Sequence, residues 1–168
     1  LLNTGNGTFT FKDNLPGGNM DTYAIVLGDL DGDGKLDIVA GNNNQSNYFL
    51  INKGNGTFHE LVPLPGGDTM VRTKAVTLGD INGDEALDIV IGNDGQSNQI
   101  LYNKGNGKFH DPVPLRGAEG SNTEAVVLGD LDGDGLVDII IANNPQSNQV
   151  LMNQGNGTFI VEDIAKDV

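Results

Sequence analysis

Residues 29–37 read Asp-Leu-Asp-Gly-Asp-Gly-Lys-Leu-Asp, and this stretch decides the fold because it returns twice along the chain. It recurs as Asp-Ile-Asn-Gly-Asp-Glu-Ala-Leu-Asp at 80–88 and as Asp-Leu-Asp-Gly-Asp-Gly-Leu-Val-Asp at 130–138, at spacings of 51 and 50 residues. Self-similarity at a fixed period of this length indicates a fold built from repeated supersecondary units.

Two further motifs keep the same order and the same period. Gly-Asn-Gly-(Thr/Lys)-Phe begins at Gly5, Gly54, Gly105 and Gly155. Gln-Ser-Asn begins at Gln45, Gln96 and Gln146. Three motifs that recur together therefore divide the chain into equivalent units.

The local signals within each unit are those of short β-strands. Apolar runs at 24–28, 75–79 and 125–129 end at Gly-Asp, and further runs follow the Asp-rich loop, as at 138–142 and 150–153. Gly-Asn-Gly then supplies the positive-φ residues of a tight hairpin turn, and Thr-Phe opens a fourth strand. Each unit is therefore predicted to be four antiparallel strands, which we call A to D in chain order.

A single sheet of four short strands cannot bury both of its faces. Sheets that repeat with a period of about 50 residues pack face to face around an axis. The sequence therefore predicts an all-β fold, a β-propeller built of four-stranded antiparallel blades. A linear solenoid is the alternative, although its repeats are usually shorter and its strands parallel.

The motifs predict three full blades and a C–D half blade within one propeller-type domain. Residues 1–20 hold the half blade and a link, and residues 21–70, 71–120 and 121–168 hold blades 1 to 3. Closed propellers have about four to eight blades. We therefore expect either a piece of a longer array or chains that associate to close the ring. The first residue is Leu rather than Met, which favours a processed or trimmed piece.

The Asp-rich loops carry hard oxygen ligands at alternating positions. Side chains at positions 1, 3, 5 and 9, with a backbone carbonyl at position 7, form a pattern with which a short loop wraps Ca²⁺ rather than Zn²⁺ or Cu²⁺. One Ca²⁺ is therefore predicted in each loop. The predicted ligands are Asp29, Asp31, Asp33, Lys35 and Asp37; Asp80, Asn82, Asp84, Ala86 and Asp88; and Asp130, Asp132, Asp134, Leu136 and Asp138.

Two other interpretations of these loops are weaker. The bidentate Glu that an EF-hand needs at position 12 would fall at Ala40, Ile91 and Ile141, and the flanking segments are strands. Merely solvated turns would not explain why 12 of the 23 acidic residues crowd into the three loops, because converging carboxylates repel one another without a cation. Glu85 stands where the other loops have Gly, and we expect its backbone to be strained.

The Asp-rich loop, the Ile/Val-rich strand after it and the Asn-Gly-Asn-Gly-Thr-Phe hairpin together resemble the FG-GAP/VCBS repeat family. That family includes the calcium-bearing blades of integrin α-subunit propellers, repeats of bacterial and algal surface proteins, and some lectins. The resemblance covers nearly the whole chain. It implies a seven-bladed or otherwise many-bladed propeller with structural Ca²⁺ in the A–B loops, acting in adhesion or ligand binding. The chain departs from that pattern in its blade number and at Glu85.

The alternation of strand direction places the B–C turns and D–A links at the end of each blade opposite the calcium loops. The resemblance to integrin propellers implicates the same end in ligand binding. The alternative is that a polar turn repeated in every blade only satisfies backbone groups. The candidate ligand-binding residues are Gln45, Ser46, Asn47, Gln96, Ser97, Asn98, Gln146, Ser147 and Asn148.

The leading hypothesis is a calcium-binding extracellular β-propeller module that mediates adhesion or recognition of a protein or glycan. The scarcity of aromatic residues, with no Trp, weakens the lectin version. The alternatives are a structural self-assembling spacer, whose homo-oligomer closes the ring, and a non-catalytic accessory domain of a larger secreted protein.

Several classes of function are not expected. No Ser/His/Asp set or phosphate loop can be assembled, His59 and His110 are predicted on outer-strand surface, and there is no Cys, so we expect no enzyme. A net charge of −14 repels nucleic acid. No apolar stretch approaches the roughly 20 residues that a membrane span needs, so no membrane insertion is expected.

Overall fold

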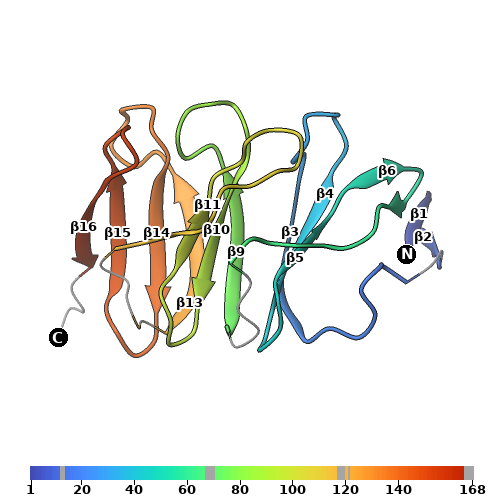
Figure 1. Ribbon diagram of the computed structural model, residues 1–168, viewed down its shortest axis with the longest axis horizontal. Coiled ribbons are helices and arrows are strands. Elements are labelled where there is room, and N and C mark those ends of the chain that lie inside the picture. Colours follow the sequence, from blue (N-terminus) through green and yellow to red (C-terminus); the bar gives the residue numbers. More distant parts are fainter. Residues whose placement is uncertain (12–13, 67–70, 117–119, 121, 165–168) are drawn as a thin grey trace.

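The computed structural model describes residues 1–11, 14–66, 71–116, 120 and 122–164. They form three four-stranded antiparallel sheets, which stand side by side, and two short hairpins (Figure 1). In this part of the chain no helix is long and apolar enough to cross a membrane. The prediction of an all-β chain of four-stranded antiparallel sheets is confirmed. Closure into a propeller stays a prediction.

In every sheet the strands lie in chain order. Sheet 1 consists of β3 (Thr22–Gly28), β4 (Asp37–Asn42), β5 (Tyr48–Leu50) and β8 (Val62–Pro63). Sheet 2 consists of β9 (Thr73–Gly79), β10 (Asp88–Asn93), β11 (Gln99–Leu101) and β12 (Val113–Pro114). Sheet 3 consists of β13 (Thr123–Gly129), β14 (Asp138–Asn143), β15 (Asn148–Asn153) and β16 (Phe159–Ile164). The two hairpins pair β1 (Leu2–Gly5) with β2 (Thr8–Thr10), and β6 (Asn52–Gly54) with β7 (Thr57–Phe58).

The fourth strand differs between the sheets. In sheet 3, β16 starts at Phe159 and pairs along the whole of β15. In sheets 1 and 2 the hairpin Phe pairs only within its hairpin, and the sheet edge is the two-residue β8 or β12. These edge strands contain Pro63 and Pro114, which have no N–H to donate to a ladder, whereas β16 has no proline. The prediction that Thr-Phe opens the fourth strand of each sheet therefore holds for sheet 3 alone.

The sheets stack face to face through their first strands. β9 packs against β3 and β4, and β13 packs against β9 and β10. Glycines in the second strands make this approach possible. A Cβ built at Gly41 would lie 2.5 Å from Thr73 Cγ2 and 2.7 Å from Val76 Cγ2, and Gly92 has the same relation to sheet 3. A side chain at these positions would force the sheets apart.

An apolar core fills each space between neighbouring sheets. Between sheets 1 and 2 it contains Val39, Phe49, Ile89 and Leu101, and it also receives Phe109 from the next hairpin. Between sheets 2 and 3 the core is formed by Ile81, Val90, Ile100, Leu115, Val126, Ile139, Ile141 and Leu151. These stacked cores make the three sheets one packed array.

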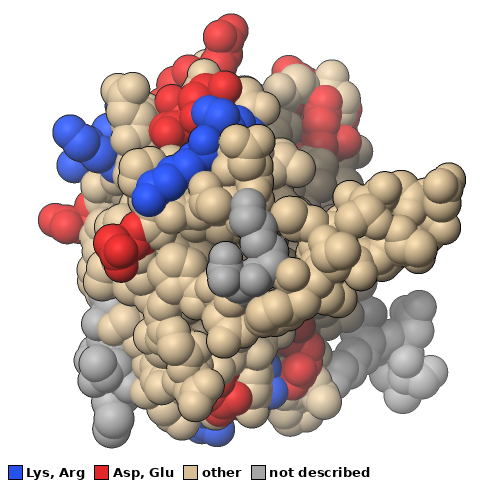
Figure 2. All heavy atoms as spheres, turned by 90° about the vertical axis from the view of Figure 1, so that its right-hand side faces the viewer, with Lys and Arg blue, Asp and Glu red and all other residues tan. Residues whose placement is uncertain are grey.

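The outer faces of sheets 1 and 3 have no neighbouring sheet within the described ranges. Figure 2 views the outer face of sheet 1, on which the charged residues that the structure describes gather mostly toward the upper and lower edges. The β1–β2 hairpin lies beside the outer part of this face, where a Cβ at Gly56 would lie 2.6 Å from Leu2 Cδ2. The inner part of the face, on β3, stays open.

Candidate metal centres

The Asp-rich loops connect the first strand of each sheet to the second, all at the same end of the array (Figure 1). Glycine makes the turns possible, because Gly32 and Gly34 have φ values of 80° and 82°, and Gly135 has 86°. Glu85 occupies the same left-handed region with φ 68°. The expected departure from normal backbone geometry is therefore present, at a position where the other two loops use Gly.

The Asp at position 1 of each loop shapes the turn through main-chain hydrogen bonds. Asp29 Oδ1 accepts from the N–H of Gly32 at 2.8 Å, and its Oδ2 accepts from the N–H of Gly34 at 2.7 Å. Asp80 and Asp130 accept the corresponding N–H groups of their own loops. Loop formation is thus specified by this carboxylate together with the glycines.

The Asp at position 9 is buried and joins the loop to the C–D hairpin. Asp37 is 0 % exposed, and its two oxygens accept the N–H groups of Leu30 and Asn52, each at 2.8 Å. Asp88 and Asp138 make the same two bonds in sheets 2 and 3. Burial and the nearby loop carboxylates raise the pKa of Asp37, and the same causes raise the pKa of Asp88 to about 6. These buried carboxylates lack a neighbouring cationic side chain among the residues that the structure describes.

Three carboxylates converge in two of the loops. Oxygens of Asp29, Asp31 and Asp37 lie within 4.8 Å of one another, and the corresponding oxygens of loop 3 do the same. The members in loop 3 are Asp130, Asp132 and Asp138. In loop 2 Asn82 takes the place of the second Asp, so its amide oxygen would replace one carboxylate while Asp80 and Asp88 remain.

The position 5 side chains are turned differently. Asp33 forms an ion pair with the Lys35 ammonium, accepts the Lys35 N–H at 2.9 Å, and lies outside the cluster. The ion pair and the hydrogen bonds hold its pKa below the usual range. Asp84 and Asp134 accept the N–H groups of Ala86 and Leu136 in the same way. In loops 1 and 3 the structure thus brings together the predicted ligands at positions 1, 3 and 9, and in all three loops the position 5 side chain bonds to the position 7 residue instead.

The donor set of the loops fits a hard divalent cation. Unit negative charges about 5 Å apart repel by about 1 kcal/mol per pair even at the dielectric constant of water, and three such pairs exist in each Asp-only cluster. Oxygen-only donors on an irregular loop suit Ca²⁺, which accepts six to eight oxygens without strict geometry. The residues present therefore fit calcium, and the position 7 carbonyls are the predicted further ligands.

The Gln-Ser-Asn turns lie at the opposite end and hold neighbouring sheets together. Asn47 is 8 % exposed, accepts the Asn42 N–H at 2.8 Å, and donates to Thr73 Oγ1 of sheet 2 at 2.9 Å. Asn98 is fully buried and donates to Thr123 of sheet 3 at 2.8 Å. Two of the candidate ligand-binding side chains are therefore engaged inside the array.

The remaining members of these turns are more accessible. Gln96, Gln146 and Asn148 are exposed, while Gln45 and the three serines are partly buried. Gln45 accepts the Asp21 N–H at 2.8 Å, and Gln146 accepts the Asn122 N–H at 3.3 Å. The amides thus also organise the links between sheets, which is the interpretation that treats these turns as structural.

A second set of inter-sheet bonds was not predicted from the sequence. Asn103 donates to the Leu30 carbonyl of sheet 1 at 3.0 Å, and Asn153 donates to the Ile81 carbonyl of sheet 2 at 2.8 Å. These asparagines precede each hairpin, and their recurrence at one position of every repeat was the available signal. They connect the hairpin of one sheet to the Asp-rich loop of its neighbour.

The chain matches the sequence model of an FG-GAP-like repeat four times, over residues 1–40, 29–91, 80–141 and 130–165. Over 104 residues it is 33 % identical to cartilage acidic protein 1 of Xenopus tropicalis. That alignment includes 55 % of this chain and 16 % of the relative. The chain therefore spans about a sixth of the length of that relative.

Asn98→Ala and Asn148→Ala separate the two roles of the turn asparagine. Asn98→Ala removes the buried bond to Thr123 and leaves the Asn93 N–H without its acceptor, so we expect a loss of about 2–3 kcal/mol of unfolding free energy. Asn148 is exposed and bonds only within its own sheet, so its replacement should cost less than about 1 kcal/mol. Urea unfolding measures both, and equal losses would contradict the inter-sheet role.

Proposed function

The chain belongs to the FG-GAP-like repeat family, and from this premise we propose that it is a calcium-binding, extracellular β-propeller module that mediates adhesion or ligand recognition. Repeats of this family are typically extracellular adhesion or recognition modules. The observation that carries the proposal is the convergence of the position 1, 3 and 9 carboxylates in loops whose backbone is already shaped by those same residues.

Each full blade would hold one Ca²⁺, giving three in the chain. Side-chain oxygens at positions 1, 3 and 9 and the position 7 carbonyl would bind the ion, with position 5 turning inward from the rim. Loop 2 would use Asn82 at position 3 and would tolerate Glu85, whose carboxylate adds charge beside the site. Bound calcium supplies positive charge to the buried position 9 carboxylate and keeps it ionised.

The calcium would act structurally rather than in catalysis. Extracellular modules bind Ca²⁺ with Kd values of about 10⁻⁴–10⁻³ M, so such loops fill outside cells. At tenfold saturation each ion stabilises the folded state by about 1.4 kcal/mol. Carboxylates held ionised by a cation are poor acid–base catalysts, which supports a binding module over an enzyme.

A protein or glycan ligand would bind at the end opposite the calcium loops. At that end Gln96 and Gln146 are exposed, and their amides could bond to sugar hydroxyls or peptide groups. Asn47 and Asn98 would contribute through the rigidity they give to the turns rather than through contact. No nucleic acid partner is proposed, because the chain carries a net charge of −14.

Self-assembly is the second candidate function, and the outer faces of sheets 1 and 3 favour it. On sheet 1, Ile25, Leu27 and Leu36 are 62 %, 54 % and 56 % exposed. The residues at the same positions of sheet 2 pack into the core against sheet 1; they are Val76, Leu78 and Leu87. Sheet 1 thus presents the same apolar surface that already joins sheets within the chain.

Sheet 3 presents the matching surface. A Cβ at Gly129 would meet nothing within 4 Å, whereas one at Gly79 would lie 2.7 Å from Leu128 Cδ1 of sheet 3. Leu131 is 48 % exposed, although its counterpart Leu30 is 2 % exposed. The Asn148 Nδ2, whose counterparts donate to Thr73 and Thr123, has no acceptor among the described residues and would meet Thr22 of a second copy.

The β1–β2 hairpin and Ala142 set the depth of such docking. Ala142 stands where sheets 1 and 2 have Gly41 and Gly92. Its Cβ would therefore make the distance from sheet 3 to a second copy slightly larger than the distance between sheets within the chain. The hairpin lies beside the outer part of the sheet 1 face and would have to shift. Head-to-tail contact of this kind generates either a ring or a filament.

The calcium proposal predicts a large, reversible effect on stability. Calcium at 10 mM, against EDTA, should raise the Tm by roughly 10 °C, because three sites at tenfold saturation add about 4 kcal/mol. Asp31→Ala removes a ligand from one of the three sites, so it should reduce the rise in Tm by about a third. Its direct cost to the fold should be small, because Asp31 accepts only the Asp33 N–H. Asp111→Asn, outside the loops, is the matched control. Melting curves that coincide in calcium and EDTA would sink the proposal.

Light scattering combined with ligand arrays separates the two candidate functions. If self-assembly is the function, the chain forms a discrete oligomer in calcium, Leu27→Asp renders it monomeric, and it binds nothing on glycan or matrix-protein arrays. If recognition is the function, array binding requires calcium and falls when Gln96 and Gln146 are both changed to Ala. A monomer in both buffers excludes the self-assembly candidate.

A further inference from the structure

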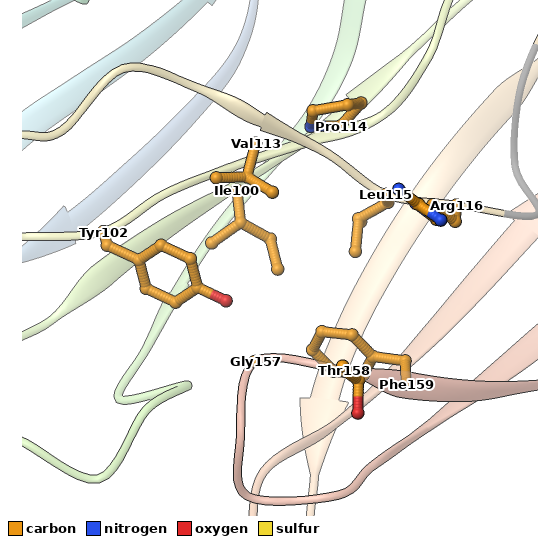
Figure 3. Close-up of a pocket in the computed structure, with 9 residues that line it drawn as sticks. All are labelled: Ile100, Tyr102, Val113, Pro114, Leu115, Arg116, Gly157, Thr158 and Phe159. Atoms are coloured by element: carbon orange, nitrogen blue, oxygen red, sulfur yellow. The ribbon is translucent and has the colours of Figure 1, made fainter.

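A cavity of about 500 Å³ lies between sheets 2 and 3, on the outer side of the array (Figure 3). Ile100 and Tyr102 line it from sheet 2, and Thr158 and Phe159 line it from the hairpin of sheet 3. Residues 113–116 form a further wall. In Figure 3 the side chains of Ile100, Tyr102 and Leu115 reach toward the ring of Phe159 across this space.

The equivalent junction between sheets 1 and 2 is filled by protein. There Phe49 takes the place of Ile100, and Phe109 takes the place of Phe159. The two rings pack edge to face with centroids 5.5 Å apart, and Phe109 is only 7 % exposed. Between sheets 2 and 3 the smaller Ile100 provides no ring, and Phe159 remains partly exposed.

The mouth of the cavity carries a cation that its counterpart lacks. Arg116 stands where the first junction has Pro65, and it is exposed. The chain has one other arginine, Arg72, which pairs with Asp94 at 3.3 Å. Arg116 forms no ion pair with any described residue, although the chain carries a net charge of −14.

We propose that this cavity binds a small aromatic carboxylate. Its ring takes the position that the Phe49 ring has in the first junction, edge to face with Phe159, and is covered by Ile100 and Leu115. Its carboxylate accepts hydrogen bonds from the Arg116 guanidinium, which presents donors in a planar fork suited to that group. A volume of about 500 Å³ lies within the range of small-molecule sites.

The surrounding charges fix one orientation for this ligand. A second hollow of about 700 Å³ adjoins the cavity at Tyr102 and contains the carboxylates of Asp84 and Asp111. An anionic group placed at that end would be repelled, whereas at the other end it meets Arg116. The carboxylate therefore points toward Arg116 and away from the metal loop of sheet 2.

The test uses 3-phenylpropionate as the probe and 3-phenylpropanamide as its neutral partner, with the whole chain in calcium. We expect the carboxylate to bind with a Kd of about 1 mM, as is usual for a molecule of this size. The amide should bind about fivefold more weakly, since it loses the charge-assisted bond to an exposed arginine. Saturation-transfer NMR and chemical-shift titration measure both constants.

Three variants identify the site. Ile100→Phe supplies the missing ring from the protein and should abolish binding of both probes while leaving the Tm equal or higher. Arg116→Gln should weaken the carboxylate about fivefold and leave the amide unchanged. Arg72→Gln, which changes the other arginine, should alter neither.

Two results would overturn the proposal: no binding of the carboxylate at 10 mM probe, or equal binding by Ile100→Phe and the unchanged chain. If Ile100→Phe does not fold, Arg116→Pro, which copies the residue of the first junction, decides. If Arg116→Pro still binds 3-phenylpropionate more tightly than 3-phenylpropanamide, the carboxylate does not bind at Arg116. That result would contradict the proposal.

Discussion

One buried carboxylate in each sheet joins the Asp-rich loop to the hairpin. In sheets 2 and 3 the hairpin asparagine beside it also bonds to the preceding sheet. Asp88 accepts the N–H of Ile81 in its loop at 3.0 Å and that of Asn103 in its hairpin at 2.8 Å. The Asn103 side chain then donates to the Leu30 carbonyl of the preceding sheet. Because this carboxylate is buried and its pKa is raised to about 6, the whole arrangement depends on a charge that the protein alone leaves uncompensated. The calcium ion proposed for the adjoining loop would supply the compensation.

Much of the fold could be predicted because the repeat encodes it locally. Positive-φ glycines, alternating strand runs and the fixed period specify strands, turns and sheet order without long-range information. The first strands start two residues earlier than expected, at Thr22, Thr73 and Thr123. Thr73 and Thr123 accept hydrogen bonds from Asn47 and Asn98 of the preceding sheet, which no local propensity reports. Likewise, the hairpin motif predicts a fourth strand that starts at its Phe, but in sheets 1 and 2 the edge strand is the short β8 or β12. Each of these contains one proline, Pro63 or Pro114, which cannot donate to a ladder.

The candidate sites also combine features that the local sequence predicts with features that depend on contacts between distant residues. Alternation of Asp along the loop was sufficient to indicate the carboxylates that converge in loops 1 and 3, at positions 1, 3 and 9, whereas the outward turn of Asp33 toward Lys35 depends on a neighbouring side chain. That these carboxylates bind a metal stays a prediction. The buried role of Asn47 and Asn98 was not predictable, because a polar turn looks the same whether it faces solvent or a second sheet. The cavity beside Ile100 also required the structure, since it arises from a difference between two junctions that share one backbone.

The central claim is that the Asp-rich loops are calcium sites, and counting ions tests it most directly. Native mass spectrometry of the chain in a volatile buffer with millimolar calcium should show three bound Ca²⁺ per chain, released by chelator. The account predicts three because loop 2 retains Asp80 and Asp88 beside the Asn82 amide. A chain that carries no calcium under these conditions would contradict it, and the buried carboxylates would then need another source of stabilisation.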